Sequence, residues 1–260
     1  MHYKAKRKFG QNFLKDQAYL NQIIEAIPYT QSQMIEIGIG LGDLTDKLLK
    51  IHDLITYEVD NDLCSLLSDK YERLIKDKHF CLICCDVMEL KNQTQWLHPK
   101  PYFLVSNLPY YIATHIVLRL LRDEMCEGLV VMTQKEVAHK FCAKALQKDF
   151  CALSVLAQSV GEVEFLFEVP PSAFEPAPKV TSAVFRILKK SNHPTLDTFK
   201  QLESLLKTAF ASPRKKLNNN LSHIYPKQKI LDAFQSLGLK EHVRPHEVST
   251  LIYHQLLKIL

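Results

Sequence analysis

The segment Met34 to Thr45 constrains the fold of this chain more than any other. It begins with the apolar run Met-Ile-Glu-Ile, continues through a loop with glycines at positions 38, 40 and 42, and ends in the start of an amphipathic helix. A strand, a glycine loop and a helix in this order are typical of the nucleotide-binding turn in open α/β sheets. The sequence therefore predicts a parallel sheet that binds a ligand at the carboxyl ends of its strands.

The spacing of these glycines argues against a dinucleotide as the ligand. The dinucleotide fingerprint needs its third glycine at position 43, where this chain has Asp43. Glu36 precedes the first glycine, so its negative charge would meet the pyrophosphate of a dinucleotide. The same carboxylate suits a ligand with a positive amino group. These features favour S-adenosylmethionine over NAD.

Two later apolar runs are also followed by an acidic residue. Glu58 lies 20 residues after Gly38, which is the spacing that brings a carboxylate to ribose hydroxyls. Asp86 follows the next run, and its carboxylate is expected to accept a hydrogen bond from an adenine amine. Because the carboxyl ends of parallel strands meet at one edge of a sheet, we expect Glu36, Glu58 and Asp86 to share one cofactor site.

A fourth apolar run, Tyr102 to Ser106, leads into the sequence Asn107-Leu108-Pro109-Tyr110. The side-chain oxygen of Asn107 and the backbone oxygen of Leu108 can accept hydrogen bonds from an exocyclic amine, while Tyr110 stacks on the base that bears it. Such contacts aim the nitrogen lone pair at an electrophile, and adenine N6 is the natural fit. Asn-x-Pro also occurs in ordinary turns. Its place after a fourth strand favours a role in methyl transfer.

The layout of the chain predicts an α/β fold. Strands and helices alternate from Met34 to Gln147, which indicates a Rossmann-like parallel sheet with helices on both faces. Two alternating runs follow, Glu162 to Val169 and Val180 to Leu188, and we expect them to pair antiparallel. The proline-rich loop between them is expected to lie over the pocket, with Phe174 at its tip.

The remainder of the chain predicts a small helical domain. Apolar periodicity predicts helices over residues 196–211, 227–237 and 247–260. The polar stretch at residues 189–194 marks a boundary. We therefore expect a methyltransferase domain over residues 1–190 and a substrate-recognition domain over residues 191–260.

Basic residues gather at both ends of the chain. Residues 1–30 hold five Lys/Arg against two Asp/Glu, and residues 201–260 hold nine against four, whereas residues 31–200 have a net charge of −3. Cationic ends on a slightly acidic body suit a protein that grips nucleic-acid phosphates. Arg214, Lys215 and Lys216 follow Pro213 at an expected helix start, and we expect them to meet an RNA groove.

The cysteines and the apolar runs bear on the cellular compartment. An odd number of cysteines, seven, scattered through expected strands and helices predicts free thiols in a reducing cytoplasm. Cys81 and Cys84 form a CxxC pair, but three positions apart on a strand they face opposite sides and lack a partner pair, so we expect no metal site. We expect no signal peptide and no membrane-spanning segment.

These motifs resemble the KsgA (RsmA) family of small-subunit ribosomal RNA adenine dimethyltransferases nearly end to end. The more specific matches are the runs Lys8 to Leu14 and Pro170 to Ser182. Together with the arguments above, the resemblance implies a cofactor site made of Gln11, Asn12, Leu14, Glu36, Gly38, Gly40, Glu58, Asp86 and Asn107. The target adenine would be held by Asn107, Leu108, Pro109, Tyr110 and Phe174, with Tyr110 and Phe174 on opposite faces. The expected RNA contacts are Lys8, Lys179, Arg214, Lys215 and Lys216.

The resemblance also implies a reaction and its partners. A class I methyltransferase of this kind uses S-adenosylmethionine to dimethylate N6 of two adjacent adenosines in the 3′-terminal hairpin of 16S ribosomal RNA, as a step of ribosome biogenesis. We expect direct in-line displacement without a metal ion or a covalent intermediate. The partner would be the small ribosomal subunit, and we expect the protein to be a cytoplasmic monomer.

Three rival functions remain open. The first is a large-subunit ribosomal RNA adenine methylase that confers antibiotic resistance, and Leu108 with the long Pro170 to Ser182 segment disfavours it. The second is a glutamine side-chain methylase, which typically has proline in place of Leu108 and needs no basic ends. The third is a non-catalytic ribosome assembly factor, against which the intact acidic residues and Asn107 argue.

Overall fold

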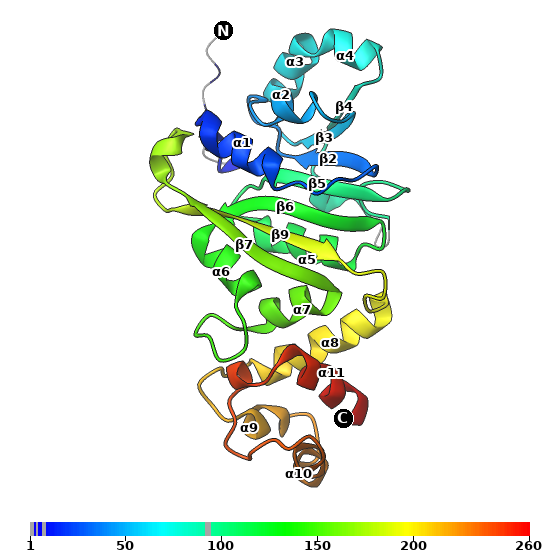
Figure 1. Cartoon of the computed structure of the whole chain (residues 1–260), viewed down its shortest axis with the longest axis vertical. Helices are drawn as coiled ribbons and strands as arrows, with labels where there is room; N and C mark the ends of the chain where they lie inside the picture. The colour runs from blue at the N-terminus through cyan, green and yellow to red at the C-terminus, as the bar shows by residue number, and fades with distance from the viewer. Residues whose placement is uncertain (1–2, 4, 7–8, 92–94) are drawn as a thin grey trace. The chain divides into compact units, whose positions relative to one another are not determined.

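The computed structural model describes residues 3, 5–6, 9–91 and 95–260 (Figure 1). The chain forms two compact units, Met1–Ala138 with Glu164–Lys189 and His139–Val163 with Lys190–Leu260. The second stretch of the second unit begins at Lys190, next to the predicted boundary, but the unit also includes His139–Val163, which the sequence had assigned to the first domain. The reason is packing, because the helix over residues 152–160 contacts helices near the end of the chain.

A seven-stranded sheet forms most of the first unit, in the order β4-β3-β2-β5-β6-β9-β7. Its strands are β2 (Gln33–Ile37), β3 (Leu54–Glu58), β4 (Phe80–Cys84), β5 (Tyr102–Asn107), β6 (Cys126–Gln134), β7 (Gly161–Val169) and β9 (Ser182–Lys189). Strands β2 to β6 pair in parallel with their neighbours, and β9 runs antiparallel to β6. The predicted α/β fold with a mostly parallel sheet is therefore confirmed.

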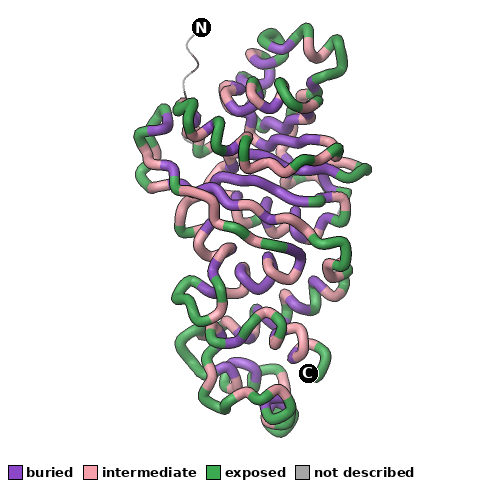
Figure 2. Tube along the Cα trace, in the orientation of Figure 1, coloured by how far each residue is buried: buried purple, intermediate pink, exposed green. Residues whose placement is uncertain are grey.

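The central strands are buried on both faces (Figure 2). In β5, each residue from Tyr102 to Val105 has an exposed fraction of 2% or less. A continuous apolar run is the pattern expected of a parallel strand that is covered by helices on either side. This buried strand gives Asn107, at its end, a rigid support.

Strand β2 is the point where the strand order reverses. It has β3 on one side and β5 on the other, and the chain continues outward from it in both directions. Open α/β sheets bind ligands in the crevice outside the carboxyl ends of the strands at such a point. The glycine loop follows β2, so the fold places it in this crevice.

Short helices flank this sheet (Figure 1). They are α1 (Gln17–Glu25), α2 (Thr45–Leu48), α3 (Asn61–Lys70), α4 (Glu72–Lys76), α5 (Ala113–Arg122) and the 3-10 turns η2 (Val87–Glu89) and η3 (Pro171–Ala173). The side chain of Asp16 caps α1 by accepting from the backbone N–H of Ala18 at 2.8 Å. Leu20 and Ile23 on α1 are buried in the core of this unit.

Phe174 does not lie where the sequence predicts. It starts the short strand β8 (Phe174–Glu175), which pairs antiparallel with β1 (Phe13–Leu14) so that Phe174 stands opposite Leu14. Its side chain is only 6% exposed and joins the hydrophobic core with Val169 and Ala173. The expected loop-tip position is therefore wrong, because the proline-rich loop folds back and pairs with the N-terminal segment.

The second unit is helical. Its helices are α6 (Lys135–Cys142), which crosses the unit boundary, α7 (Ala152–Val160), α8 (Leu196–Ala209), α9 (Leu217–Leu221), α10 (Lys227–Ser236), the 3-10 turn η4 (Pro245–Glu247) and α11 (Thr250–Ile259). The three predicted helices are confirmed to within a few residues, and α9 begins directly after Lys216, close to the helix start expected after Pro213. Among the residues that the structure describes, no helix is long and apolar enough to cross a lipid bilayer.

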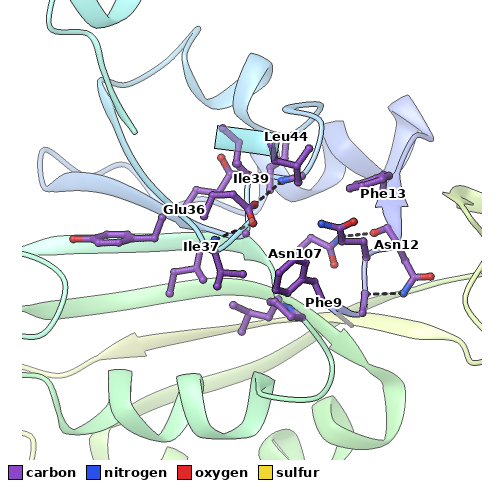
Figure 3. A pocket seen from close by; sticks show the side chains of 18 of the residues that line it. Phe9, Asn12, Phe13, Glu36, Ile37, Ile39, Leu44 and Asn107 are labelled. Carbon is purple, nitrogen blue, oxygen red and sulfur yellow. Dashed lines mark hydrogen bonds between the residues drawn. The ribbon is translucent and has the colours of Figure 1, made fainter. Parts of the chain in front are cut away.

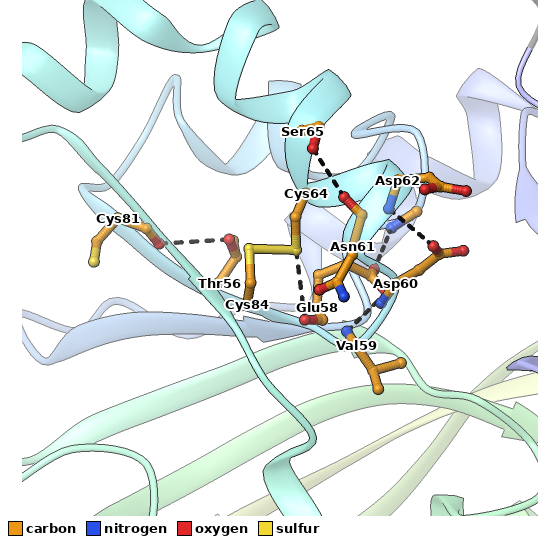
Figure 4. Close-up of a disulfide and its surroundings, with 11 residues drawn as sticks. Thr56, Glu58, Val59, Asp60, Asn61, Asp62, Cys64, Ser65, Cys81 and Cys84 are labelled. Carbon is orange, nitrogen blue, oxygen red and sulfur yellow. Dashed lines mark hydrogen bonds between the residues drawn. A yellow bond between two sulfur atoms is a disulfide. The ribbon is translucent and has the colours of Figure 1, made fainter.

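Two of the cysteines are joined, contrary to the prediction of free thiols. Cys64 on α3 and Cys84 at the end of β4 form a disulfide, with their Cα atoms 6.1 Å apart (Figure 4). Helix α3 contacts β4 directly, and this contact brings together two cysteines that are 20 positions apart in the sequence. Strand periodicity did not predict this disulfide, because periodicity relates residues of the same strand, whereas Cys64 lies on a helix and Cys84 on a strand.

Candidate active site

A pocket in the first unit lies at the carboxyl ends of β2, β3, β4 and β5 (Figure 3). It brings together all the predicted cofactor residues and most of the predicted base-holding residues. The predicted residues that line it are Gln11, Asn12, Leu14, Glu36, Gly38, Gly40, Glu58, Asp86, Asn107, Leu108, Pro109 and Tyr110. Phe174 is absent from this lining, although its strand partner Leu14 belongs to it.

The glycine loop lets the N-terminal segment approach the end of β2. Gly38 and Gly40 have φ angles of +74° and +58°, a region that side chains other than glycine rarely adopt. A Cβ atom on Gly40 would lie 2.9 Å from a ring carbon of Phe13. The glycine at position 40 is therefore needed both for the turn and for contact with the segment that carries Asn12.

Glu36 is a buried carboxyl group in the wall of the pocket. Its exposed fraction is 1%, and its Oε2 atom accepts a hydrogen bond of 2.6 Å from the hydroxyl of Thr45. Burial raises the pKa of Glu36 to about 8, and the nearby carboxylate of Glu58 adds to the rise. A positively charged group in the pocket would favour the ionised form of Glu36.

Glu58 is held firmly at the end of β3. Its Oε1 atom accepts from the backbone N–H groups of Val59 and Asp60, both at 2.9 Å, and its Oε2 atom accepts from Gly40 N–H at 3.4 Å. The side chain is 5% exposed, and burial raises its pKa. The geometry fixes the carboxylate next to the glycine loop.

Asp86 marks the end of β4. Its Oδ1 atom accepts from the backbone N–H of Met88 at 2.8 Å and so caps the 3-10 turn η2. This capping role is the ordinary one for an aspartate after a strand. Asp86 also lines the pocket, so the structure places Glu36, Glu58 and Asp86 in one cavity as the sequence predicts.

The Asn107 side chain is oriented by the N-terminal segment. Its Nδ2 atom donates to the backbone oxygen of Asn12 at 3.2 Å (Figure 3). This bond uses the amide nitrogen and leaves the Oδ1 atom as the acceptor toward the pocket. Leu108 is buried, and its N–H donates to the backbone oxygen of Met132 at 3.1 Å. Among the described residues, no donor to the Leu108 carbonyl oxygen is found.

Tyr110 is half-buried at the side of this pocket. Its hydroxyl forms a hydrogen bond of 2.5 Å with the hydroxyl of Ser182, which begins β9. Burial raises the pKa of Tyr110, so the ring stays neutral at physiological pH. The bond to Ser182 holds the hydroxyl end of the Tyr110 side chain in place.

Several pocket residues escaped the sequence analysis. The side chains of Phe9, Phe13, Tyr57, Cys85 and Tyr111 also line the cavity. Tyr111 is 58% exposed, so much of its side chain is open to solvent at the edge of the pocket. A second tyrosine directly after the Asn-Leu-Pro-Tyr sequence was the signal that could have identified it.

A concave cationic surface lies on the second unit. It is lined by Arg214, Lys215, Lys216, Asn219, His242, Arg244 and Glu247. The backbone N–H of Leu217 donates to Val243 at 2.8 Å, which holds the predicted basic run against the loop that carries His242 and Arg244. These two residues were not predicted from the sequence, because they lie in another part of the chain.

The other predicted RNA contacts lie outside this surface. Lys179 is exposed in the loop that precedes β9. Lys8 lies outside the described residues. No group of three or more His, Cys, Asp or Glu side chains forms a candidate metal site in the part of the chain that the structure describes.

Comparisons with known proteins agree with this arrangement. A family model described as ribosomal RNA adenine dimethylase matches residues 2–260. The chain is 53% identical to a protein named ribosomal RNA small subunit methyltransferase A from Helicobacter hepaticus, over 99% of this chain and 92% of that protein.

Two solved structures share the fold. The 23S rRNA methyltransferase ErmE has a TM-score of 0.74 and 25% identity, over 96% of this chain and 99% of that one. A dimethyladenosine transferase from Plasmodium falciparum has a TM-score of 0.77 and 23% identity, over 94% and 95%. With a family model that spans almost every residue, the chain belongs to the ribosomal RNA adenine dimethylase family.

Proposed function

We propose that this chain uses S-adenosylmethionine to dimethylate N6 of two adjacent adenosines in the 3′-terminal hairpin of 16S ribosomal RNA. The observation that carries this proposal is that Asn107, Leu108 and Tyr110 line the same pocket as three strand-end carboxyl groups. The family to which the chain belongs consists of S-adenosylmethionine-dependent methyltransferases that act on ribosomal RNA adenine.

The groups in the pocket suit this cofactor. Its ammonium group matches the buried Glu36, its ribose hydroxyls match Glu58, and its adenine amine matches Asp86. Apolar and aromatic neighbours such as Phe13 and Val87 supply surfaces for the remaining atoms. The bound cofactor supplies an electrophilic methyl group on a sulfonium.

The role of the protein residues is to position the amine of the target adenine. Asn107 Oδ1 and the Leu108 carbonyl oxygen accept its two hydrogen atoms, which aims the nitrogen lone pair. Tyr110 stacks on the base, and a stack of this kind contributes about 1–3 kcal/mol, which helps to offset the cost of extruding the base. Phe174 is proposed for the opposite face. Because it is buried in the core and does not line the pocket, this role requires its side chain to turn toward the base when RNA binds.

The cationic surface of the second unit is proposed to bind RNA phosphates. Arg214, Lys215 and Lys216 are exposed, and their positive charges lie around one concavity with Arg244. Release of counterions from RNA would make this binding depend on salt concentration. We further propose that Lys179 and Lys8 contact RNA, that the protein acts as a cytoplasmic monomer on the small ribosomal subunit, and that residues 191–260 serve in substrate recognition.

The small-subunit substrate is favoured over the rivals. The chain is 53% identical to a protein named for the small subunit and 25% identical to one named for 23S ribosomal RNA. An assembly factor without catalysis would not need three carboxyl groups and an oriented amide in one pocket. Leu108 in place of proline disfavours glutamine as the substrate.

The direct test is to incubate the protein with radiolabelled S-adenosylmethionine and small subunits that lack the two modifications. We expect label in N6,N6-dimethyladenosine from the 3′-terminal hairpin. Fully modified small subunits are the matched control and should remain unlabelled. Label confined to large subunits, or to protein, would overturn the proposal in favour of one of the rival enzymes.

A further inference from the structure

Asp60 is hydrogen-bonded to three side chains of the N-terminal segment, although it does not itself line the pocket. It accepts hydrogen bonds from Lys6 Nζ at 2.6 Å, from Gln11 Nε2 at 3.0 Å and from the hydroxyl of Tyr3. The exposed fraction of Asp60 is 2%. We call this cluster of Tyr3, Lys6, Gln11 and Asp60 the Asp60 hub.

The hub anchors the part of the chain that forms one wall of the pocket. Residues 9–14 all line the cavity. Gln11 lies within this stretch, and its Oε1 atom accepts from the backbone N–H of Lys6 at 2.7 Å. The same Oε1 atom lies 3.0 Å from the hydroxyl oxygen of Tyr3, whose single hydrogen can be donated either to Gln11 or to Asp60. Both ends of the Gln11 amide are therefore engaged in the hub. Its side chain therefore holds the segment in the ligand-free protein, and Gln11 also lines the pocket.

The other side of the hub is the strand end that carries Glu58. The backbone N–H of Asp60 donates to Glu58 Oε1 at 2.9 Å, and Asp60 Oδ1 accepts from the backbone N–H of Asp62 at 3.1 Å (Figure 4). The second of these bonds caps α3. One aspartate thus joins the N-terminal wall, the Glu58 wall and the first turn of α3.

The charge of Asp60 persists over the pH range in which proteins are folded. Burial acts to raise the pKa of Asp60, but the hydrogen bonds from Lys6, Tyr3 and Gln11 outweigh it and lower the pKa to about 2. Hydrogen bonds to an ionised acceptor are stronger than those between neutral groups. Asp60 is therefore ionised at neutral pH, where it can anchor these three side chains.

We propose that Asp60 is a positioning residue for methyl transfer: through Tyr3, Lys6 and Gln11 it fixes residues 9–14 against the strand end that bears Glu58. This inference rests on the proposed function in one respect, that S-adenosylmethionine is the ligand held between these two walls. Loss of the hub should weaken cofactor binding, because the free protein must then order residues 9–14 when the ligand binds.

The test uses the double variant Tyr3→Phe/Lys6→Met in the full chain. It removes two donors to Asp60 and leaves the α3 cap and the hydrogen bonds of Glu58 in place. We expect amides of residues 9–14 to exchange hydrogen faster in the ligand-free protein. We expect the KM for S-adenosylmethionine to rise about tenfold, while kcat at saturating cofactor changes less than about threefold. The variant Tyr3→Phe/Lys6→Arg keeps the positive charge beside Asp60, so its KM for S-adenosylmethionine should return most of the way to the wild-type value.

Asp53→Asn is the control. Asp53 pairs with His79 at 2.7 Å at the amino ends of β3 and β4, whereas the pocket lies at the carboxyl ends of these strands. This variant should leave exchange at residues 9–14 and the KM unchanged. Unaltered exchange and KM in Tyr3→Phe/Lys6→Met would overturn the positioning role. A wild-type protein that binds no S-adenosylmethionine would instead refute the proposed function, while the exchange experiment would still decide whether the hub anchors the segment.

Discussion

The Nδ2 atom of Asn107 donates a hydrogen bond of 3.2 Å to the backbone oxygen of Asn12, which lies 95 positions earlier in the chain. The same N-terminal segment that borders the cofactor side of the pocket therefore also sets the orientation of the amide proposed to hold the target amine. A contact of this kind links cofactor binding to the geometry of the acceptor site, since both depend on residues 9–14.

Replacing Asn107 with alanine should separate catalysis from RNA binding. The variant loses the side-chain acceptor for the amine but keeps Tyr110 to stack on the base, so we expect methyl transfer to fall by a factor of about 100 or more. Single-turnover rates and filter binding to unmodified small subunits measure the two effects. Asn21→Ala, which removes an exposed amide bonded to Lys47, is the control. A near-normal rate for Asn107→Ala would show that the amide does not position the amine.

Glu58→Gln should weaken cofactor binding without disturbing the end of β3. Glutamine can still accept from the backbone N–H groups of Val59 and Asp60, but it lacks the charge that strengthens hydrogen bonds to ribose hydroxyls. Titration calorimetry should show an affinity for S-adenosylmethionine about tenfold lower or more, since a charged hydrogen bond contributes about 1.5–3 kcal/mol. Glu72→Gln on the exposed face of α4 should have no effect. Equal affinity in both variants would remove Glu58 from the site.

The sequence predicted the strand ends of this site well, for a simple physical reason. Parallel strands buried on both faces are continuous apolar runs, so a polar residue such as Glu58 or Asp86 at the end of a run marks the edge of the sheet. The glycine loop after β2 shows where the strand order reverses. Residue order along the chain was enough to bring Glu36, Glu58, Asp86 and Asn107 together.

Contacts between distant and ordinary-looking residues could not be predicted in this way. Tyr3, Lys6 and Asp60 have no pattern in the sequence that sets them apart from solvated side chains, and only the fold shows that they meet. The pairing of Phe174 with Leu14 is likewise tertiary. Helix α7 belongs to the second unit because it packs on α8 and α11. The periodicity of its sequence shows that it has an apolar face but does not show which helices cover that face.

Cofactor binding should release a proton near neutral pH. With a pKa of about 8, Glu36 is mostly protonated in the ligand-free protein at pH 7, and the ammonium group of the cofactor would favour its ionised form. Calorimetric titrations at pH 7 should therefore give different binding heats in two buffers with different heats of ionisation. The size of this difference should correspond to the release of close to one proton per bound cofactor. Glu36→Gln should bind weakly and show no such difference. Equal heats in both buffers for the wild-type protein would mean that Glu36 is already ionised.

The same carboxyl group should make the stability of the ligand-free protein fall as pH rises. The pKa of Glu36 is raised from 4.5 in the unfolded chain to about 8 in the folded one, so the folded state binds more protons between these values. The free energy of unfolding should decrease across this window with a slope of at most about 1.4 kcal/mol per pH unit. Urea denaturation at a series of pH values measures it, and Glu36→Gln should flatten the curve. An unchanged slope in that variant would assign the effect to other groups.

Replacing Arg214, Lys215 and Lys216 together with alanine should weaken RNA binding and reduce its dependence on salt. If all three contact phosphates, the slope of log K against log salt concentration should become shallower by about 2, while affinity for S-adenosylmethionine stays the same. Lys207, Lys227 and Lys240 are exposed cations of the same unit that lie outside the concave surface, so their triple replacement controls for net charge. Equal slopes for the two triple variants would place the RNA contact elsewhere on the protein, because the loss of charge alone would then explain the change.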